Sequence, residues 1–150
     1  MKLGIASDHG GFELKEELKK HIEEKGIEIK DFGTHSLESV DYPDYAKKLC
    51  DAVLSSEVDL GIAICGTGVG VSIACNKVDG IRAGHCTDSF TARMIRNHNN
   101  ANVICLGGRI TGIEIAKDII DNFLNSEFEG GRHQNRIDKI TEIEKGGCNV

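Results

Sequence analysis

Tryptophan is absent from the 150-residue chain, and aromatic residues make up only 5% of it. Proteins that bind single-stranded nucleic acid stack bases on aromatic side chains, so this composition argues against such a surface. The net charge of −6 also argues against binding to nucleic acid or to an anionic membrane. No apolar run approaches the roughly 20 residues that a membrane-spanning helix needs. The first residues, MKLGIASDHGG, lack the long apolar region and the small-residue cleavage site of a signal peptide.

Disulfide and metal spacings are also missing from the sequence. The six cysteines, at positions 50, 65, 75, 86, 105 and 148, include no Cys-x-x-Cys pair. Several fall in apolar segments, which is typical of reduced thiols in an intracellular protein, and we expect Cys75 to serve helix packing. The histidines show no His-x-x-x-His spacing, so we expect neither a metal nor another cofactor. These patterns together predict a cytoplasmic protein.

Apolar segments with strand character alternate along the chain with helical patterns. This alternation is typical of βαβ units, in which helices cover both faces of a parallel sheet. We therefore expect a single α/β domain over residues 1–150, with a five-stranded parallel sheet and a C-terminal helix. The expected strands cover 2–7, 27–32, 60–65, 81–86 and 102–107. The expected helices begin at Phe12 and at Pro43 and then cover 69–76, 89–96, 112–125 and 133–144.

The ends of two predicted helices carry clear signals. Gly26 follows the first helix as its C-terminal cap, and Pro43 suits the first turn of the second helix. The expected buried face of the second helix consists of Ala46, Leu49, Cys50, Val53 and Leu54.

The last predicted helix breaks the alternation, because no strand follows it. Ile137, Ile140 and Ile143 form a narrow apolar stripe along it. Such a terminal helix either packs on its own domain or reaches to a partner subunit, and the sequence leaves both possibilities open.

Three loops rich in glycine and polar residues follow predicted strands. They cover residues 7–11, 65–70 and 106–109. In open α/β sheets, ligands bind outside the carboxyl ends of the strands, where these loops are expected to lie. Two further polar clusters, at 97–100 and 130–136, are candidates to close over that rim.

The loop at 65–70 reads CGTGVG and is the richest of these in glycine. Glycines let backbone N–H groups approach an anion, and the start of the following helix adds a positive field. A dinucleotide-binding fingerprint would need glycine where the chain has Val71, and no Gly-Lys-Ser/Thr of a Walker A motif follows. The two interpretations left open are an anion-binding loop and a tight strand-to-helix turn.

Cys65 opens this loop. A cysteine at the end of a buried strand is often only a small apolar residue. A thiol beside a helix N-terminus ionises more readily, and it then acts as a nucleophile or as a general base. The base role needs a place for negative charge, which the N–H groups of Gly66 to Gly70 would supply in the manner of an oxyanion hole.

The remaining polar residues are weaker signals when each is taken alone. Arg132 and Arg136 are four residues apart, so both lie on one helical face, which suits either a phosphate group or a solvated surface. Asp8 either joins the site or caps the following helix. His98 either joins the site or lies on the surface.

Together these motifs resemble the type B ribose-5-phosphate isomerases, within the wider family of ribose and galactose-6-phosphate isomerases. The resemblance covers essentially the whole chain in order. It rests on SDHGGF at 7–12, DYP at 41–43, ICGTGVG at 64–70, RNHN at 96–99, NV at 102–103 and EGGRH at 129–133.

The resemblance implies a Rossmann-like three-layer α/β/α fold and a homodimer, sometimes paired into a tetramer. The implied reaction converts D-ribose 5-phosphate to D-ribulose 5-phosphate through an enediol, without metal, in the non-oxidative branch of the pentose phosphate pathway. In this reaction Cys65 is the base that moves a proton between C2 and C1, and Thr67 helps the oxygen-bound proton. His98, with Asp8 nearby, opens the furanose ring. The resemblance also implies three kinds of substrate contact. The backbone of Gly66, Thr67, Gly68, Val69 and Gly70 holds the enediolate. The phosphate is contacted by His9, Arg109, Arg132 and Arg136, and Asn99 is a further substrate contact.

The topology predicts that two subunits share each site. His98 precedes the fifth strand, whereas Cys65 ends the third, and parallel strands end at one edge of a sheet. A neighbouring chain must therefore bring His98 to Cys65. The resemblance assigns Asp8, His9, Cys65, Arg132 and Arg136 to one subunit, and His98, Asn99 and Arg109 to its partner.

Two alternative functions remain open at this point. The first is an isomerase for a six-carbon phosphosugar, such as allose 6-phosphate or galactose 6-phosphate, because the sequence does not reveal the depth of the pocket. The second is a non-catalytic nucleotide-binding module of Rossmann type, and Val71 argues against it.

Overall fold

Five parallel strands form one sheet, in the order β2-β1-β3-β5-β4. This architecture comes from a computed structural model that describes residues 1–147, so Cys148 lies outside the described residues. The strands are β1 (Lys2–Ser7), β2 (Glu28–Asp31), β3 (Leu60–Cys65), β4 (Ala83–His85) and β5 (Val103–Gly107). The helices are α1 (Phe12–Glu24), α2 (Tyr42–Leu54), α3 (Val69–Cys75), α4 (Ser89–Asn99), α5 (Ile113–Leu124) and α6 (Arg132–Glu144).

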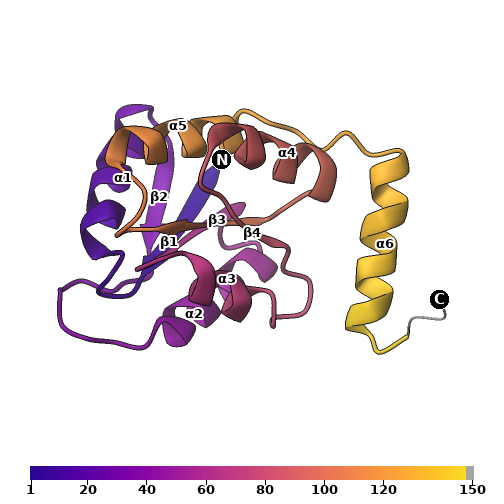
Figure 1. Ribbon diagram of the computed structural model, residues 1–150, viewed down its shortest axis with the longest axis horizontal. Coiled ribbons are helices and arrows are strands. Elements are labelled where there is room, and N and C mark those ends of the chain that lie inside the picture. Colours follow the sequence, from indigo (N-terminus) through magenta and orange to yellow (C-terminus); the bar gives the residue numbers. More distant parts are fainter. Residues whose placement is uncertain (148–150) are drawn as a thin grey trace.

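Helices cover both faces of the sheet, as the alternation of elements predicts. Successive side chains of a strand point to opposite faces, so each strand supplies two separate apolar clusters. Leu3 and Ile5 of β1 pack in the cluster under α1, α4 and α5, while Ala6 packs in the cluster under α2 and α3. Figure 1 shows α1, α5 and α4 on one side of the sheet and α2 and α3 on the other. The predicted three-layer α/β/α fold is confirmed.

The boundaries of two elements differ from the prediction in ways that matter for the site. The strand predicted over 81–86 is reduced to β4, Ala83–His85. The helix predicted over 89–96 continues to Asn99, because Asn100 takes the left-handed conformation (φ 45°) and its N–H closes the helix on the carbonyl of Arg96. His98 therefore lies on the last turn of a helix.

The predicted helix caps are confirmed, and one predicted core residue is wrong. Gly26 follows α1 with φ +74°, a conformation that favours glycine, and Pro43 lies in the first turn of α2. Leu54 was expected in the core, but its side chain is exposed because it ends α2. Ala52 is buried on that helix instead.

The five described cysteines are buried free thiols. A hydrogen bond with Cys75, together with burial, raises the pKa of Cys50, and a hydrogen bond with Cys105 raises that of Cys75. Burial raises the pKa of Cys86 to about 12. These three thiols therefore stay protonated near neutral pH and act as small apolar residues, in agreement with the interpretation of Cys75 as packing.

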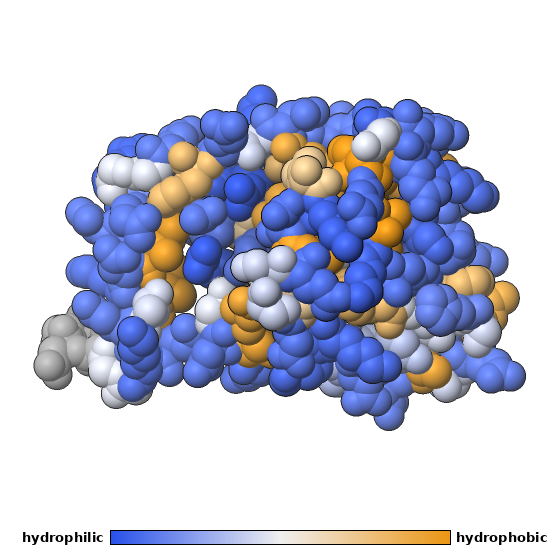
Figure 2. Space-filling model, turned by 180° about the vertical axis from the view of Figure 1, so that it is seen from behind, coloured by the Kyte–Doolittle hydropathy of each residue, from blue (hydrophilic) through white to orange (hydrophobic). Residues whose placement is uncertain are grey.

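The C-terminal helix α6 stands at one end of the molecule, against the end of α4 (Figure 1). Only His133 and Ile137 of α6 are buried, whereas Ile140 and Ile143 are 45% and 60% exposed. A cavity of about 540 Å³ separates the apolar stripe of α6 from the rest of the chain. Figure 2 shows this hollow beside a column of apolar side chains. The helix thus packs partly on its own chain, and much of its stripe is uncovered. None of the helices within residues 1–147 is long and apolar enough to traverse a bilayer.

Candidate active site

The three loops singled out in the sequence meet at the carboxyl edge of the sheet. The N–H of Gly108 donates to the carbonyl of Cys65 over 2.8 Å, and the N–H of Arg109 donates to that of Gly66 over 3.0 Å. The contacts leave no room for side chains. A Cβ atom added at Gly10 would lie 3.0 Å from the nitrogen of Gly66, and one at Gly108 would lie 2.5 Å from the carbonyl oxygen of Gly10. Glycine is thus needed here for close approach between loops.

Cys65 lies at the centre of this cluster, with only 4% of its surface exposed. The loop turns back over its side chain, and the N–H of Gly68 donates to Sγ over 3.2 Å. Gly68 has φ +80°, which lets the chain turn its N–H inward at this point. Thr67 is exposed at the tip of the loop, where its Oγ1 accepts from the N–H of Val69 over 3.4 Å.

Asp8 and His9 approach the glycine loop from the end of β1. Asp8 is buried, and its Oδ1 accepts from the N–H of Gly11 over 3.1 Å, a bond within the loop that precedes α1. Among the described residues, no side chain caps the first N–H groups of α1, so the interpretation of Asp8 as a helix cap is wrong. Nδ1 of His9 accepts from the N–H of Val40 over 3.2 Å, which places the proton of the neutral ring on Nε2. A cavity of about 300 Å³ opens beside His9 and is lined by His9, Gly10, Glu13, Leu14, Leu37, Gly108 and Arg109.

A second group of predicted residues gathers around α6. The ring of His98 stacks on that of His133, with 4.2 Å between centroids and 7° between planes. Burial, the neighbouring His98 and Arg132 lower the pKa of His133. Arg132 and Arg136 are exposed on the first turns of α6, and Asn99 is exposed at the end of α4.

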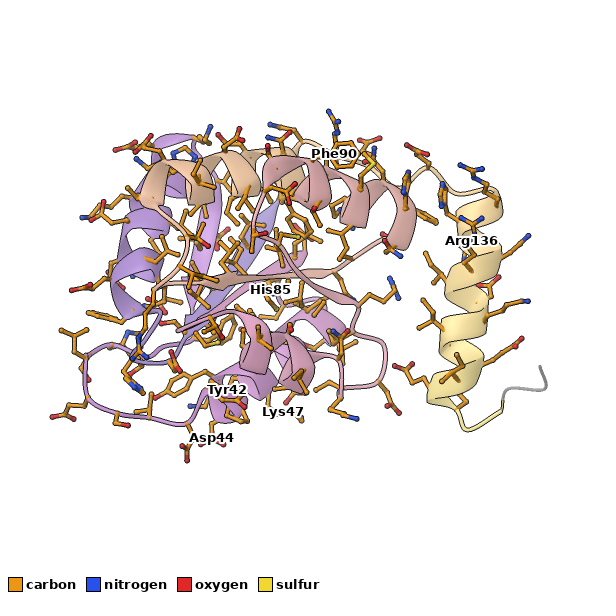
Figure 3. The ribbon with its side chains drawn as sticks, viewed as in Figure 1. Tyr42, Asp44, Lys47, His85, Phe90 and Arg136 are labelled. Carbon is orange, nitrogen blue, oxygen red and sulfur yellow. The ribbon has the colours of Figure 1, made fainter. Side chains whose placement is uncertain are left out.

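The two groups lie at opposite edges of the sheet. Cys65 is in register with Gly107, the last residue of β5, whereas the segment after His98 enters β5 at Val103. The four steps from Val103 to Gly107 span about 13 Å at roughly 3.3 Å per residue. In Figure 3, Arg136 on α6 is correspondingly far from Tyr42, which touches the glycine loop. Within one chain, His98 therefore cannot reach Cys65.

This arrangement corrects the expected division of the site between subunits. Arg109 was assigned to the partner of Cys65, but its side chain lies beside Gly66 in the same chain, because it directly follows β5. Arg132 and Arg136 were assigned to the subunit of Cys65, but they share α6 with His133, which stacks on His98. Helix α5 carries the chain back to the amino edge, and α6 starts there.

The chain is similar in sequence to proteins of a known family over nearly its whole length. The family model described as Ribose/Galactose Isomerase matches residues 3–140. The chain belongs to the ribose/galactose isomerase family.

Relatives in this family match the chain over nearly its whole length. Ribose-5-phosphate isomerase B of Escherichia coli is 50% identical over 144 residues, which cover 96% of this chain and 97% of that protein. The structure of Clostridium thermocellum ribose-5-phosphate isomerase B is 57% identical, has a TM-score of 0.96, and covers 97% of this chain and 99% of that one. The enzyme of Mycoplasma genitalium, solved with bound ribulose-5-phosphate, is 45% identical, has a TM-score of 0.92, and covers 97% of each chain.

This member of the ribose/galactose isomerase family also carries two residues at the glycine loop, Tyr42 and His85, for which the sequence patterns predicted no role. A Cβ atom at Gly70 would lie 2.8 Å from Cζ of Tyr42, and one at Gly68 would lie 2.6 Å from Cδ2 of His85. Nε2 of His85 is buried and has no hydrogen-bond partner among the described residues. Tyr42 belongs to the DYP motif, whereas His85 lay inside a predicted strand and gave no signal.

A third oversight concerns Glu129. Its Oε2 lies beside the stacked rings, 3.9 Å from Nε2 of His98 and 3.6 Å from Nε2 of His133. The expectation of no metal site rested on cysteine and histidine spacings alone. His98 and His133 are 35 positions apart in the sequence, so their closeness to Glu129 in the fold produces no short His-x-x-x-His type of spacing.

Proposed function

We propose that the protein is an aldose–ketose isomerase that interconverts D-ribose 5-phosphate and D-ribulose 5-phosphate through an enediol. One observation carries the proposal: the Cys65 thiol accepts from the backbone N–H of Gly68 in its own glycine loop, directly beside the loops that hold His9 and Arg109. Moving a proton next to a carbonyl requires a base, donors for the enediolate oxygen and an anchor for the phosphate. The relatives named ribose-5-phosphate isomerase B support the choice of substrate.

The proposed reaction uses the thiolate of Cys65 as the base. It takes the proton from C2 of the open-chain aldose, and the electron pair of that C–H bond forms the C1–C2 double bond of the enediolate. Negative charge then moves to the C1 oxygen, where N–H groups of residues 66–70 stabilise it. Thr67 assists transfer of a proton from the C2 hydroxyl to the C1 oxygen. Return of the first proton from sulfur to C1 completes the ketose.

His98 opens the furanose ring in this scheme, with Asp8 nearby. Because these two residues lie at opposite edges of the sheet in one chain, His98 must come from a second copy. We therefore infer a homodimer in which each site combines two parts. One chain supplies Asp8, His9, Cys65, the loop 66–70 and Arg109, and its partner supplies His98, Asn99, Arg132 and Arg136.

Electrostatics favour this pairing of the two parts. Arg109 and His9 lie beside a cavity with Glu13, so one chain offers few positive charges for a phosphate dianion. Arg132 and Arg136 of the partner would add two guanidinium groups, whose fork geometry suits phosphate oxygens. The uncovered stripe of α6 supplies apolar surface for the same dimer. Pairing of dimers into a tetramer, a cytoplasmic location and a place in the pentose phosphate pathway stay predictions.

The function is tested by measuring ketose formation from a panel of aldose phosphates. We expect turnover of ribose 5-phosphate to exceed that of allose 6-phosphate and galactose 6-phosphate. Replacing Cys65 by alanine should lower turnover by at least about 10²-fold, the lower end for general-base catalysis, while leaving phosphosugar binding largely intact. Cys75→Ala is the matched control, because this buried thiol lies in the same cluster and should be dispensable for turnover.

Two outcomes would reject the proposal. Preferred turnover of allose 6-phosphate or galactose 6-phosphate would make the enzyme a six-carbon phosphosugar isomerase instead. A Cys65→Ala variant that kept more than about a tenth of wild-type turnover would remove the base from the mechanism. Titration with NAD and AMP tests the nucleotide-binding alternative, and we expect no binding.

A further inference from the structure

The histidine that opens the sugar ring in the proposed reaction lies at the end of a helix. His98 belongs to the last turn of α4, which ends at Asn99. The last carbonyl groups of a helix have no N–H partner within the helix, and helix ends fray. Catalysis needs the imidazole at a fixed place, because a misplacement of about 1 Å can cost about 100-fold in rate. The last turn of α4 therefore needs support from outside the helix.

Arg82 gives this support from the segment before β4. Its Nε donates to the carbonyl oxygens of Asn99 and Asn100, each over 3.0 Å, and its Nη2 donates to that of Asn100 over 2.9 Å. The guanidinium fork thus bridges two consecutive carbonyl groups, which the single ammonium group of a lysine cannot reproduce. Its positive charge also suits the C-terminal end of a helix.

Arg96 holds the same turn from within α4. Its Nη1 donates to Oδ1 of Asn100 over 3.0 Å and to the carbonyl oxygen of Ala101 over 2.6 Å. Asn100 has φ 45°, and its N–H donates to the carbonyl oxygen of Arg96 over 3.1 Å. The side chains of Arg82 and Arg96, called the arginine clamp below, therefore bind the carbonyl groups of three consecutive residues, 99–101.

The backbone of Arg82 is itself fixed, so the clamp has a firm base. Oδ1 of Asn102 accepts from the N–H of Arg82 over 2.8 Å, and the N–H of Asn102 donates to the carbonyl oxygen of Arg82 over 3.1 Å. Nδ2 of Asn102 donates to the carbonyl oxygen of Gly80 over 2.9 Å. Burial lowers the pKa of both Arg82 and Arg96. A charged group that leaves water is costly unless it is hydrogen-bonded, so the carbonyl groups of the turn are needed by the arginines in return.

We propose that Arg82 and Arg96 are positioning residues for ring opening: they order the last turn of α4 so that His98 reaches the furanose ring in the partner's site. The inference rests on the proposed function. In ring opening the C1 hydroxyl loses its proton, the C1–O4 bond breaks as the C1 carbonyl forms, and O4 receives a proton. The later proton transfer between C2 and C1 uses Cys65. Loss of the clamp should therefore slow ring opening and leave the enediol step intact.

Ordering of the turn is tested without reference to activity. Hydrogen exchange followed by NMR reports on the N–H groups at positions 100–101, which bond to carbonyl groups of α4. Arg82→Ala should speed their exchange by at least about tenfold. Arg93→Ala is the matched control, because the Arg93 guanidinium of the same helix lies over the ring of Phe90, 5.4 Å from its centroid, and both exchange rates should be unchanged. Unchanged exchange in Arg82→Ala would overturn the clamp.

The effect on catalysis is tested with a sugar phosphate that has no ring to open. An analogue of ribose 5-phosphate without the C4 hydroxyl cannot close a furanose, whereas its C1, C2 and phosphate are unchanged. The ratio of kcat/KM for ribose 5-phosphate to kcat/KM for the analogue cancels any loss that both substrates share, such as weaker binding or partial unfolding. In Arg82→Ala this ratio should fall by at least about tenfold, and in Arg93→Ala it should not change.

A double-mutant cycle shows whether Arg82 acts through His98. His98→Ala should lower the ratio by at least about 10²-fold, and adding Arg82→Ala should lower it no further. Arg82→Lys keeps the charge without the fork, so it should show a smaller fall, and it decides the question if Arg82→Ala does not fold. An unchanged ratio in the Arg82 variants, or a further loss in the double variant, would overturn the positioning role. If neither sugar phosphate were turned over, the proposed function would fail, while hydrogen exchange would still decide whether the clamp orders the turn.

Discussion

Replacing Gly68 by alanine should damage both the stability and the chemistry of the glycine loop. Gly68 has φ +80°, and the left-handed region costs an L-residue about 1–2 kcal/mol. The added Cβ would also lie 2.6 Å from Cδ2 of His85 and 2.8 Å from the carbonyl carbon of Leu106. Forcing extra atoms into a packed site costs about 1–3 kcal/mol more. We therefore expect the free energy of unfolding to fall by about 2–5 kcal/mol, measured by urea denaturation.

The Gly68→Ala substitution should also lower the activity, because the added Cβ displaces the loop. The N–H of Gly68 donates to Sγ of Cys65, and the loop cannot accept a Cβ without moving that donor. Loss of one preorganised donor typically lowers kcat by about 10²–10³-fold. Ketose formation from ribose 5-phosphate, assayed at a temperature where the variant is folded, should fall by that factor.

Two further variants separate the causes. Gly112→Ala is the control, since Gly112 has φ −64° and open space around its Cα, and both measurements should be unchanged. Adding His85→Ala to Gly68→Ala removes the ring contact but leaves Leu106 and the positive φ, so stability should recover only in part. A folded Gly68→Ala enzyme with activity within a factor of about two of wild type would refute the reasoning, because the loop donor would then be dispensable.

Two other predictions concern the buried ion pair and metal-free catalysis. Burial alone would raise the pKa of Asp31, but hydrogen bonds from Lys15 and Lys19 outweigh it and hold this pKa below its ordinary value of 3.8. The stabilisation by Asp31 is therefore present above that pH and is lost as the pH falls through the lowered value. Asp31→Asn should cost about 3 kcal/mol near pH 7, because it takes a partner from the fully buried Lys15, and the deficit in denaturation experiments should shrink below pH 3.8. A deficit independent of pH would contradict this. Exhaustive treatment with a chelator should leave turnover undiminished, and activity that was lost to the chelator and restored by a divalent ion would contradict the metal-free mechanism.

The fold and one half of the site were predictable from local sequence patterns. Each strand is a short apolar run followed by a glycine-rich or polar loop, and parallel topology places those loops at one edge. The meeting of the loops around Gly10, Gly66 and Gly108 follows from this rule alone. The position of Cys65 at the end of β3 is local in the same sense.

The other half of the site depends on contacts that have no local signature. The resemblance placed Arg109 in the partner of Cys65, although Arg109 directly follows β5 and lies beside Gly66 in the same chain. It placed Arg132 and Arg136 with Cys65 because it supplied roles without the direction in which α5 returns the chain. The prediction that Leu54 is buried was wrong, because helical periodicity does not reveal that the end of a helix is exposed to solvent. The stacking of His98 on His133 and the approach of Glu129 depend on how α6 docks against α4, which no spacing encodes.

The most direct test of the central claim, that two chains together build each isomerase site, is complementation between two inactive variants. Cys65→Ala and His98→Ala are mixed, dissociated gently and reassociated, and subunit exchange is followed by mass spectrometry. In a random mixture half of the dimers are mixed, and each mixed dimer holds one site with both lesions and one with neither, so activity should return to about a quarter of wild type. Confirmed exchange without any return of ribose 5-phosphate isomerisation would show that each site lies within one chain, and the account would be wrong.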